Sequence, residues 1–133
     1  MKALVLGIVA SVLVAGVAHA DGDAAAGEAV FKKCVACHSV GEGAKNKVGP
    51  VLNDVLGRTA GTAEGFKYSK ALVDAGAGGL VWTPETVAQW MHKPKDMVKG
   101  TKMTFAGLAD ESDVQNLIAY LMTFSPGYTP AAQ

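Results

Sequence analysis

One motif in the sequence has a defined chemistry, the pentapeptide Cys34-Val35-Ala36-Cys37-His38. Residues three apart are neighbours on the surface of a helical turn, so both thiols lie on one side of the backbone. From there they can reach the two vinyl groups on one edge of a porphyrin and form thioether bonds. The histidine that follows is carried under the iron, where a ring nitrogen can serve as an axial ligand. The C-x-x-C-H motif is accordingly typical of covalent haem attachment.

Other uses of two closely spaced cysteines fit this sequence less well. A thioredoxin-like redox pair requires a βαβ context, and no strand-rich pattern flanks the motif. A structural zinc site needs four ligands, whereas the predicted mature chain has two cysteines and two histidines, His38 and His92. Cys37 and His38 are also sequence neighbours and point in different directions. The motif therefore favours covalent haem over a disulfide or a zinc site.

The first twenty residues have the pattern of a secretory signal. Lys2 is followed by an apolar stretch over residues 3–17 and by the small-x-small cleavage site at residues 18–20. The alternative is an uncleaved membrane anchor, but a spanning helix needs about 20 apolar residues. We therefore expect cleavage after Ala20, a mature domain over residues 21–133 that is not embedded in a membrane, and a periplasmic location. An unoccupied C-x-x-C would tend to oxidise in that compartment.

A second axial ligand has to come from the opposite side of the haem. Histidine is a poor candidate, because His19 leaves with the predicted signal and His92 ends a predicted helix beside Pro94. Methionine supplies a soft thioether, which suits the iron of an electron carrier and raises its potential. The sequence therefore favours a methionine as the second ligand.

The four methionines beyond the signal differ in their surroundings. Met91 and Met122 lie on predicted helices, where packing in the core is the ordinary role of a methionine. Met103 lies in the segment 99–107, which has no helical apolar period and offers no packing role. Met97 also lies outside the predicted helices. The residues alone favour Met103 and leave Met97 as the competitor.

The elements that position these ligands are predicted to be helices. Helix-start signals stand at Asp23, at Thr83 with Pro84, and at Asp110. Apolar residues with helical spacing follow Asp23 and Asp110. The predicted helices cover residues 24–36, 69–74 and 84–92, and a last one runs from Asp110 to the stop at Ser125-Pro126-Gly127. Glycine-rich connections fill residues 41–50, 57–65 and 76–79. The predicted fold class is all-α, with one domain of helices and glycine-rich loops around one haem.

The large loop content has a consequence for folding. A domain of about a hundred residues with long glycine-rich loops has little apolar area to offset its chain entropy. A porphyrin would act as an apolar core shared by every helix. The haem-free chain is therefore predicted to be largely unfolded.

From Gly22 to about Phe124 the chain resembles a class I cytochrome c, closest to the bacterial cytochrome c2 group and its mitochondrial relatives. The segments that match beyond the haem motif occur in the family's order: Gly22-Asp23, Gly27, Phe31, Lys47-Val48-Gly49-Pro50, Gly57-Arg58, Gly65-Phe66-Lys67-Tyr68, Trp82, Gly100-Thr101-Lys102-Met103, Phe105-Ala106-Gly107 and Leu117-Ile118-Ala119-Tyr120-Leu121. In that family the motif histidine and the methionine of the Gly-Thr-Lys-Met loop are the axial ligands. The resemblance thus implies His38 and Met103 as ligands and selects Met103 over Met97.

The resemblance also implies roles for residues around the haem. The carbonyl of Pro50 would accept a hydrogen bond from Nδ1 of His38, and such bonds fix the tautomer of a ligand and raise its basicity. Arg58, Tyr68 and Trp82 would surround a haem propionate. A buried propionate needs hydrogen-bond donors, and these three side chains supply them.

Further positions beside the haem include departures from the family. Trp90 and Phe105 are expected to contact the cofactor. Trp90 stands where the family commonly has a tyrosine that bonds toward the methionine sulfur, and an indole can donate but cannot accept. Leu72 replaces a side chain that is often polar, and Lys99 replaces a frequent proline. None of these changes touches the two implied ligands.

Charge is unevenly distributed along the chain. Eight lysines lie in two segments, residues 31–47 and 93–102, which contain only two acidic residues, Glu42 and Asp96. The lysines are Lys32, Lys33, Lys45, Lys47, Lys93, Lys95, Lys99 and Lys102. The rest of the predicted mature chain has three basic and ten acidic residues. A positive face at the haem edge would steer the protein toward acidic faces of membrane redox complexes. Nucleic acid is not an expected partner, because the patch is small and the chain is exported.

The resemblance implies a monomeric one-electron carrier rather than an enzyme. Its donor would be a bc1-type complex, and its acceptor would be a terminal oxidase or a photosynthetic reaction centre. Two other classes of haem protein are alternatives. A peroxidase-type enzyme needs an open iron position and a distal acid–base residue, and a ligand-binding or sensor protein needs a five-coordinate iron. Carbon monoxide would bind quickly to either of these but slowly to a six-coordinate carrier.

Overall fold

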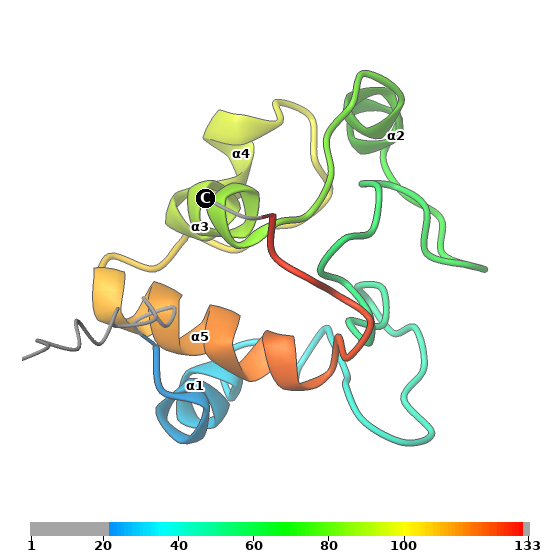
Figure 1. Cartoon of the computed structure of the whole chain (residues 1–133). Coiled ribbons are helices and arrows are strands. Elements are labelled where there is room, and N and C mark those ends of the chain that lie inside the picture. The colour runs from blue at the N-terminus through cyan, green and yellow to red at the C-terminus, as the bar shows by residue number, and fades with distance from the viewer. Residues whose placement is uncertain (1–21, 132–133) are drawn as a thin grey trace, which may run out of the picture.

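A computed structural model describes residues 22–131 of the chain (Figure 1). Its helices are α1 (Ala24–Phe31), α2 (Lys70–Ala77), α3 (Pro84–His92), α4 (Pro94–Met97) and α5 (Glu111–Thr123). Extended pairing in the described part of the chain is limited to one isolated antiparallel bridge between Thr59 and Val81. The all-α prediction is confirmed. The predicted signal over residues 1–20 lies outside the described residues, and among those described no helix is long and apolar enough to cross a membrane.

The helices begin where the capping signals predicted. The Asp23 carboxylate accepts from the N–H of Ala26 at 3.0 Å at the start of α1, and the Asp110 carboxylate accepts from the N–H of Ser112 at 2.8 Å at the start of α5. Thr83 forms a capping box with Thr86 ahead of α3. These bonds satisfy N–H groups that have no partner inside the helix.

The predicted helix ends were less accurate. The first helix was predicted to reach residue 36, but α1 ends at Phe31 and the chain continues in tighter turns. There the N–H of Cys34 bonds to the carbonyl of Phe31 at 2.7 Å, a three-residue spacing. The second helix runs on to Ala77, beyond the predicted residue 74, and was predicted too short. The haem motif therefore lies on a turn that follows a helix, not on the helix itself.

The short helix α4 was not predicted. Pro94 ends α3, because the residue before a proline disfavours the helical conformation. The same proline occupies the first position of α4, where its missing N–H removes no helical bond. Met97 therefore ends a helical turn, whereas the sequence placed it in a loop.

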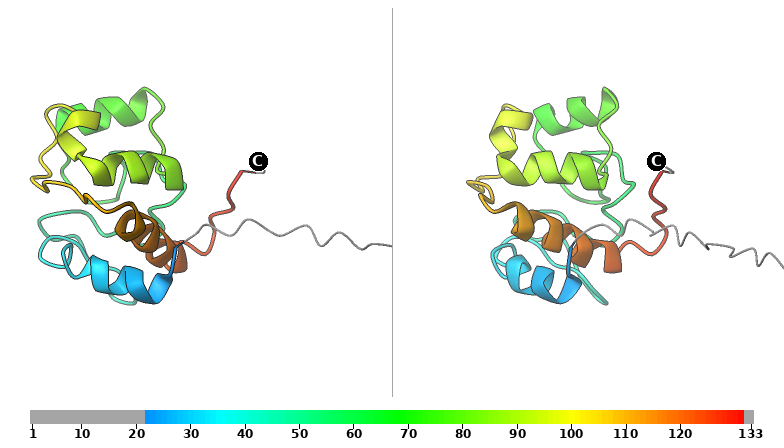
Figure 2. Two further views of the ribbon diagram at one scale, coloured as in Figure 1. Left: turned by 90° about the vertical axis from the view of Figure 1, so that its left-hand side faces the viewer. Right: turned by 60° about the vertical axis from the view of Figure 1, so that its left-hand side comes forward.

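Helices α1 and α5 cross closely and form one side of the molecule (Figures 1 and 2). Gly27 lies against the backbone of α5, where a Cβ atom would lie 1.9 Å from the carbonyl oxygen of Asn116. The rings of Phe31 and Tyr120 are 5.3 Å apart beside this contact. Only a glycine permits this approach, since any side chain would meet backbone atoms.

In both views of Figure 2, helices α2 and α3 lie on the opposite side of the molecule from the α1–α5 pair. Loops join the two groups, and Leu117 of α5 and Trp90 of α3 both point into the space that the groups enclose. The chain after α5 turns back over the loop that begins at Asp54, whose N–H donates to the carbonyl of Phe124 at 2.8 Å. The fold thus encloses a central site between two helical layers, which meet directly where α3 contacts α5.

Candidate haem-binding site

A cavity of about 450 Å³ lies between the two helical layers. Its walls contain every residue for which the sequence predicted a contact with the cofactor or the iron: Cys34, Cys37, His38, Pro50, Arg58, Tyr68, Trp82, Trp90, Met103 and Phe105. Met97, the competing ligand, is not among the residues that line it. The structure therefore brings together side chains that are spread over about seventy positions of the sequence.

The two cysteines enter the cavity from the turn that follows α1. The N–H groups of Cys37 and His38 both bond to the carbonyl of Cys34, at 3.0 and 2.9 Å. Both thiols are free and half-buried, and burial raises the pKa of the Cys34 thiol, although the charge of Lys33 opposes this shift. In residues 22–131 no three His, Cys, Asp or Glu side chains gather as ligands for a bare metal ion. The zinc alternative thus has no support in this part of the chain.

His38 is oriented by a single hydrogen bond. Its Nδ1–H donates to the carbonyl of Pro50 at 2.7 Å, so the proton sits on Nδ1 and the lone pair of Nε2 is available to a metal. Burial lowers the pKa of His38, and the bond to Pro50 only partly offsets that effect. The neutral ring is the form that coordinates iron.

Gly49 has a role at the site that the sequence reasoning missed. A Cβ atom there would lie 2.4 Å from Cε1 and 2.7 Å from Nε2 of His38. Any side chain larger than hydrogen would therefore push the imidazole out of place. The Gly49-Pro50 dipeptide is the only signal in the sequence that points to such a close approach.

Met103 reaches the cavity from the segment between α4 and α5. Its sulfur accepts a hydrogen bond from Nε1–H of Trp90 at 3.2 Å, and its N–H donates to Oγ1 of Thr101 at 3.2 Å. The indole of Trp90 is buried and packs edge-on against Trp82, with ring centroids 5.2 Å apart. Tryptophan in place of the family's tyrosine at position 90 thus still provides a hydrogen-bond donor to the methionine sulfur. A thioether has two lone pairs, so the second remains available to a metal.

The guanidinium of Arg58 is held against the cavity wall by backbone carbonyls. Its Nη1 and Nη2 donate to the carbonyl of Val51 at 3.2 and 3.1 Å, and Nε is buried with no partner among the described residues. Burial lowers the pKa of Arg58, while Tyr68 and Asp54 act in the opposite sense. A desolvated cation with an unused donor suits a neighbouring anion.

The hydroxyl of Tyr68 and the buried ring of Trp82 complete this side of the cavity. The Tyr68 oxygen accepts from the N–H of Ala63 at 3.0 Å, which leaves its own proton free for another acceptor. Phe105 contributes apolar wall on the methionine side. Two thiols, an imidazole, a thioether, apolar walls and a cationic corner together fit a covalently attached haem with a propionate at Arg58.

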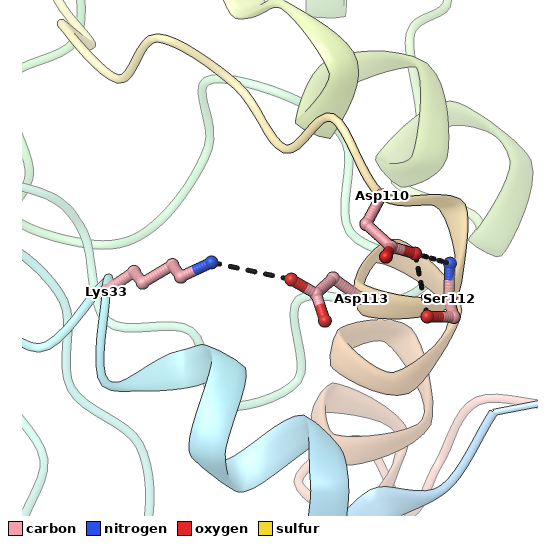
Figure 3. Close-up of polar contacts among 4 residues, drawn as sticks. All are labelled: Lys33, Asp110, Ser112 and Asp113. Atoms are coloured by element: carbon pink, nitrogen blue, oxygen red, sulfur yellow. Dashed lines mark hydrogen bonds and ion pairs between the residues drawn. The ribbon is translucent and has the colours of Figure 1, made fainter.

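All eight lysines of the predicted docking face are exposed. Lys33 and Lys102 line the cavity itself. Lys33 also lies 3.4 Å from the carboxylate of Asp113 at the start of α5 (Figure 3), and Lys93 lies 3.7 Å from Asp96. Exposed ion pairs of this kind contribute little to stability, so these ammonium groups remain available to other anions.

The sequence and the fold both match known proteins. The Cytochrome c family matches residues 24–125. A cytochrome c2 of Blastochloris viridis is 52% identical over 126 residues, which cover 94% of this chain and 95% of that protein. A cytochrome c2 of Agrobacterium tumefaciens is 51% identical over 111 residues, or 84% of this chain and 99% of that protein. The structure of cytochrome c2 from Rhodospirillum centenum superposes with a TM-score of 0.76 at 46% identity and covers 79% of this chain and 100% of its own.

These matches confirm three predictions made from the sequence. The helices and loops form the class I cytochrome c fold, the cofactor is a covalently bound haem c, and the relatives are electron carriers rather than enzymes. The matched region also covers nearly all of the segment in which the resemblance was found. The chain therefore belongs to the cytochrome c family, as a class I c-type cytochrome close to the cytochromes c2.

Proposed function

We propose that this cytochrome is a soluble, monomeric, periplasmic one-electron carrier whose haem iron is held by His38 and Met103. The observation that supports these ligands is their arrangement in one cavity, where each is oriented by a hydrogen bond that leaves a lone pair available. His38 donates to Pro50 at 2.7 Å, and Met103 accepts from Trp90 at 3.2 Å. Ligands fixed in this way need little rearrangement between the two oxidation states.

Haem c supplies a reversible one-electron change at its iron. The chain contributes the conditions for that change. The bond from His38 to Pro50 fixes the tautomer and increases the basicity of the imidazole. Buried apolar residues such as Leu117 and Trp90 keep water away from the iron, which together with a thioether ligand favours a high potential. Arg58 offers a positive charge to a propionate.

Export is part of this proposal. Residues 1–20 would direct secretion and be removed after Ala20, and the mature protein would comprise residues 21–133. The eight lysines would dock it briefly on a bc1-type donor and on an oxidase or a photosynthetic reaction centre. Attraction between opposite charges speeds such encounters more than it tightens them.

The absorption spectrum of the oxidised protein tests the ligand assignment. Sulfur-to-iron charge transfer gives a weak band at the red edge of the visible spectrum in the wild type. We expect Met103→Ala to lose the band and Met97→Ala to keep it. Survival of the band in Met103→Ala would overturn the assignment of Met103.

Carbon monoxide tests the proposed carrier against the two alternative classes of haem protein. The reduced wild type is expected to resist the gas, because both axial positions are held. Met103→Ala is expected to bind it quickly. Rapid binding to the wild type would instead favour a sensor or a peroxidase-type enzyme.

A further inference from the structure

We propose that Tyr128, in the segment after α5, is a positioning residue that holds Arg58 toward the haem propionate and thereby raises the reduction potential. The inference rests on the proposed function, because it needs a redox-active haem with a propionate at Arg58. Tyr128 lies after residues 24–125, the part of the chain that matches the family. Its role is therefore argued from the contacts that it makes in this structure.

The segment after α5, red in Figure 1, is tied to the loop that precedes Arg58. The carbonyl of Phe124 accepts from the N–H of Asp54 at 2.8 Å, and Oγ of Ser125 accepts from the N–H of Leu56 at 3.3 Å. The N–H of Tyr128 donates to the carbonyl of Ser125 at 3.0 Å, which turns the chain back. Ser125 is buried, so this attachment is shielded from water.

The ring of Tyr128 lies on Gly57, the residue directly before Arg58. A Cβ atom at Gly57 would lie 3.2 Å from Cδ2 and 3.9 Å from Cε2 of Tyr128. Gly57 has a φ of +86°, in the left-handed region that glycine adopts readily. Glycine also has more backbone freedom than any other residue. Contact with the half-buried tyrosine ring restricts that freedom at the point from which Arg58 extends.

Trp82 holds the same dipeptide through its backbone. The N–H of Gly57 donates to the carbonyl of Trp82 at 2.7 Å, and the N–H of Trp82 donates to the carbonyl of Arg58 at 2.9 Å. These bonds fix the peptide groups but leave the Cα of Gly57 to its contact with Tyr128. The tyrosine therefore adds a restraint that the backbone bonds do not provide.

Arg58 connects this contact to the haem-binding cavity. It lines that cavity and also a surface groove, which Asp54, Gly57 and Tyr128 line too and which we call the outer groove. Its guanidinium donates to the carbonyl of Val51, while Nε is buried with no partner among the described residues. A movement of the backbone beside Tyr128 would therefore change the donor offered to a propionate.

Asp54 offers Arg58 a competing anion. It is exposed and lines the outer groove. Burial lowers the pKa of Arg58, whereas Tyr68 and Asp54 oppose this shift, so the Asp54 charge attracts the guanidinium. Without the tyrosine ring, the guanidinium can turn toward Asp54 and away from the propionate.

The direction of the effect follows from charge. Ferric haem carries one more positive charge than ferrous haem, so a propionate without a counter-charge stabilises the ferric form. Arg58 held at the propionate cancels part of this attraction and favours the ferrous form. Loss of the restraint from Tyr128 should therefore lower the reduction potential.

Spectroelectrochemical titration of the holoprotein at pH 7 tests the inference. Tyr128→Ala should shift the equilibrium with a reference couple about threefold toward the ferric form, the scale of a partly exposed ion pair. That shift is about 28 mV for one electron, since a tenfold change is 59 mV. Tyr128→Phe keeps the ring and should match the wild type. Burial and the charge of Glu85 both raise the pKa of Tyr128, so the phenol is neutral and its loss removes no charge.

A buried residue far from Arg58 provides the matched control for lost stability. Val30 is buried on α1 and lines neither the haem-binding cavity nor the outer groove. Val30→Ala should lower the thermal midpoint, because it removes packed methyl groups, and it should leave the potential unchanged. An equal fall in potential in Val30→Ala would show that general loosening, and not Tyr128, is the cause.

Two measurements examine whether Tyr128 acts through Arg58. In a double-mutant cycle, Tyr128→Ala added to Arg58→Gln should lower the potential no further, because the charge that it positions is gone. In the ferrous wild type and Tyr128→Ala holoproteins, NMR measures how fast the Nε–H of Arg58 exchanges with water. We expect faster exchange in Tyr128→Ala.

The outcomes separate this inference from the proposed function. Equal potentials for Tyr128→Ala and the wild type overturn the role of Tyr128, as does an equal fall in Tyr128→Phe or an undiminished effect in the Arg58→Gln background. The electron carrier stands in each of these cases. Rapid binding of carbon monoxide to the wild type would instead refute the carrier, and the inference that rests on it would fall as well.

Discussion

Trp90 stands where the family commonly has a tyrosine, and this difference changes the hydrogen bond to the sulfur of Met103. A tyrosine hydroxyl can donate and accept, whereas the indole can only donate, and here it donates to Met103 at 3.2 Å. A hydrogen bond draws electron density from the sulfur, which weakens its bond to ferric iron more than to ferrous iron. The indole is therefore expected to raise the reduction potential.

Replacement of Trp90 tests this effect. Trp90→Phe keeps an aromatic ring but removes the donor, so the reduction potential should fall. If the hydrogen bond contributes about 1 kcal/mol, the fall is about 40 mV for a one-electron couple, in which a tenfold change in the equilibrium constant is 59 mV. Trp90→Tyr restores a donor and should recover part of the difference. Spectroelectrochemical titration at pH 7 measures all three potentials, and equal potentials for the Phe variant and the wild type would contradict the role of the bond.

The residues that the sequence singled out for the cofactor all line one cavity, but most of the contacts between them were not predicted. The thiols, the imidazole and the thioether are recognisable by residue type and by motif. The hydrogen bond between Trp90 and Met103 joins α3 to a loop residue thirteen positions later. The close approach that requires glycine at position 49 involves the imidazole ring of His38, eleven positions earlier. Such contacts depend on how the loops close over the cavity, and no local pattern in the sequence encodes that closure.

At the scale of elements, helix starts were predictable and helix ends were not. A capping side chain binds the backbone two or three residues away, so the signal at Asp23, Thr83 or Asp110 is local. The end of α1 depends instead on the turn that carries the haem motif, and α4 depends on a proline that both ends one helix and begins another. The end of α1 and the position of α4 therefore depend on the path that the following loop takes, and not on a local capping signal.

The start of α5 has a testable pH dependence. Two hydrogen bonds from Ser112, from its hydroxyl at 2.7 Å and from its N–H at 2.8 Å, lower the pKa of the Asp110 carboxylate (Figure 3). A group whose pKa is lowered on folding contributes stability above its unfolded pKa, and this contribution is lost as the pH falls through the folded pKa. The contribution of Asp110 should therefore be fully present at pH 6 and be lost progressively as the pH falls below about 4.

Asp110→Asn isolates that contribution, because asparagine is also a good cap but does not titrate. Urea unfolding of the holoprotein should show a lower free energy of unfolding for the variant at pH 6. The gap from the wild type should close as the pH approaches 2. Ser112→Ala, which removes only the hydroxyl bond, should give a smaller gap. A gap that stays constant over this range would contradict the assignment.

For the molecule as a whole, the site and the core are the same region. The cavity of about 450 Å³ is lined by buried residues of both helical layers, including Leu117, Leu121, Val87 and Trp90. Side chains around such a cavity lack packing partners, and lost packing of this kind destabilises a folded core. Whole domains are stable by only about 5–15 kcal/mol. The cofactor is thus expected to decide whether the chain folds at all.

The haem-free mature protein, produced as Cys34→Ser/Cys37→Ser in a cell compartment without haem attachment, is the direct test. Serine is close in size to cysteine, so these substitutions alone change the packing little. We expect its far-UV circular dichroism to show little of the helix of the holoprotein and its heating curve to show no cooperative transition. Both layers would lose most of the surface against which they pack, because α3 meets α5 directly whereas α2 faces α1 and α5 only across the cavity. A cooperative transition with full helix content would show instead that the two layers collapse onto each other without the haem.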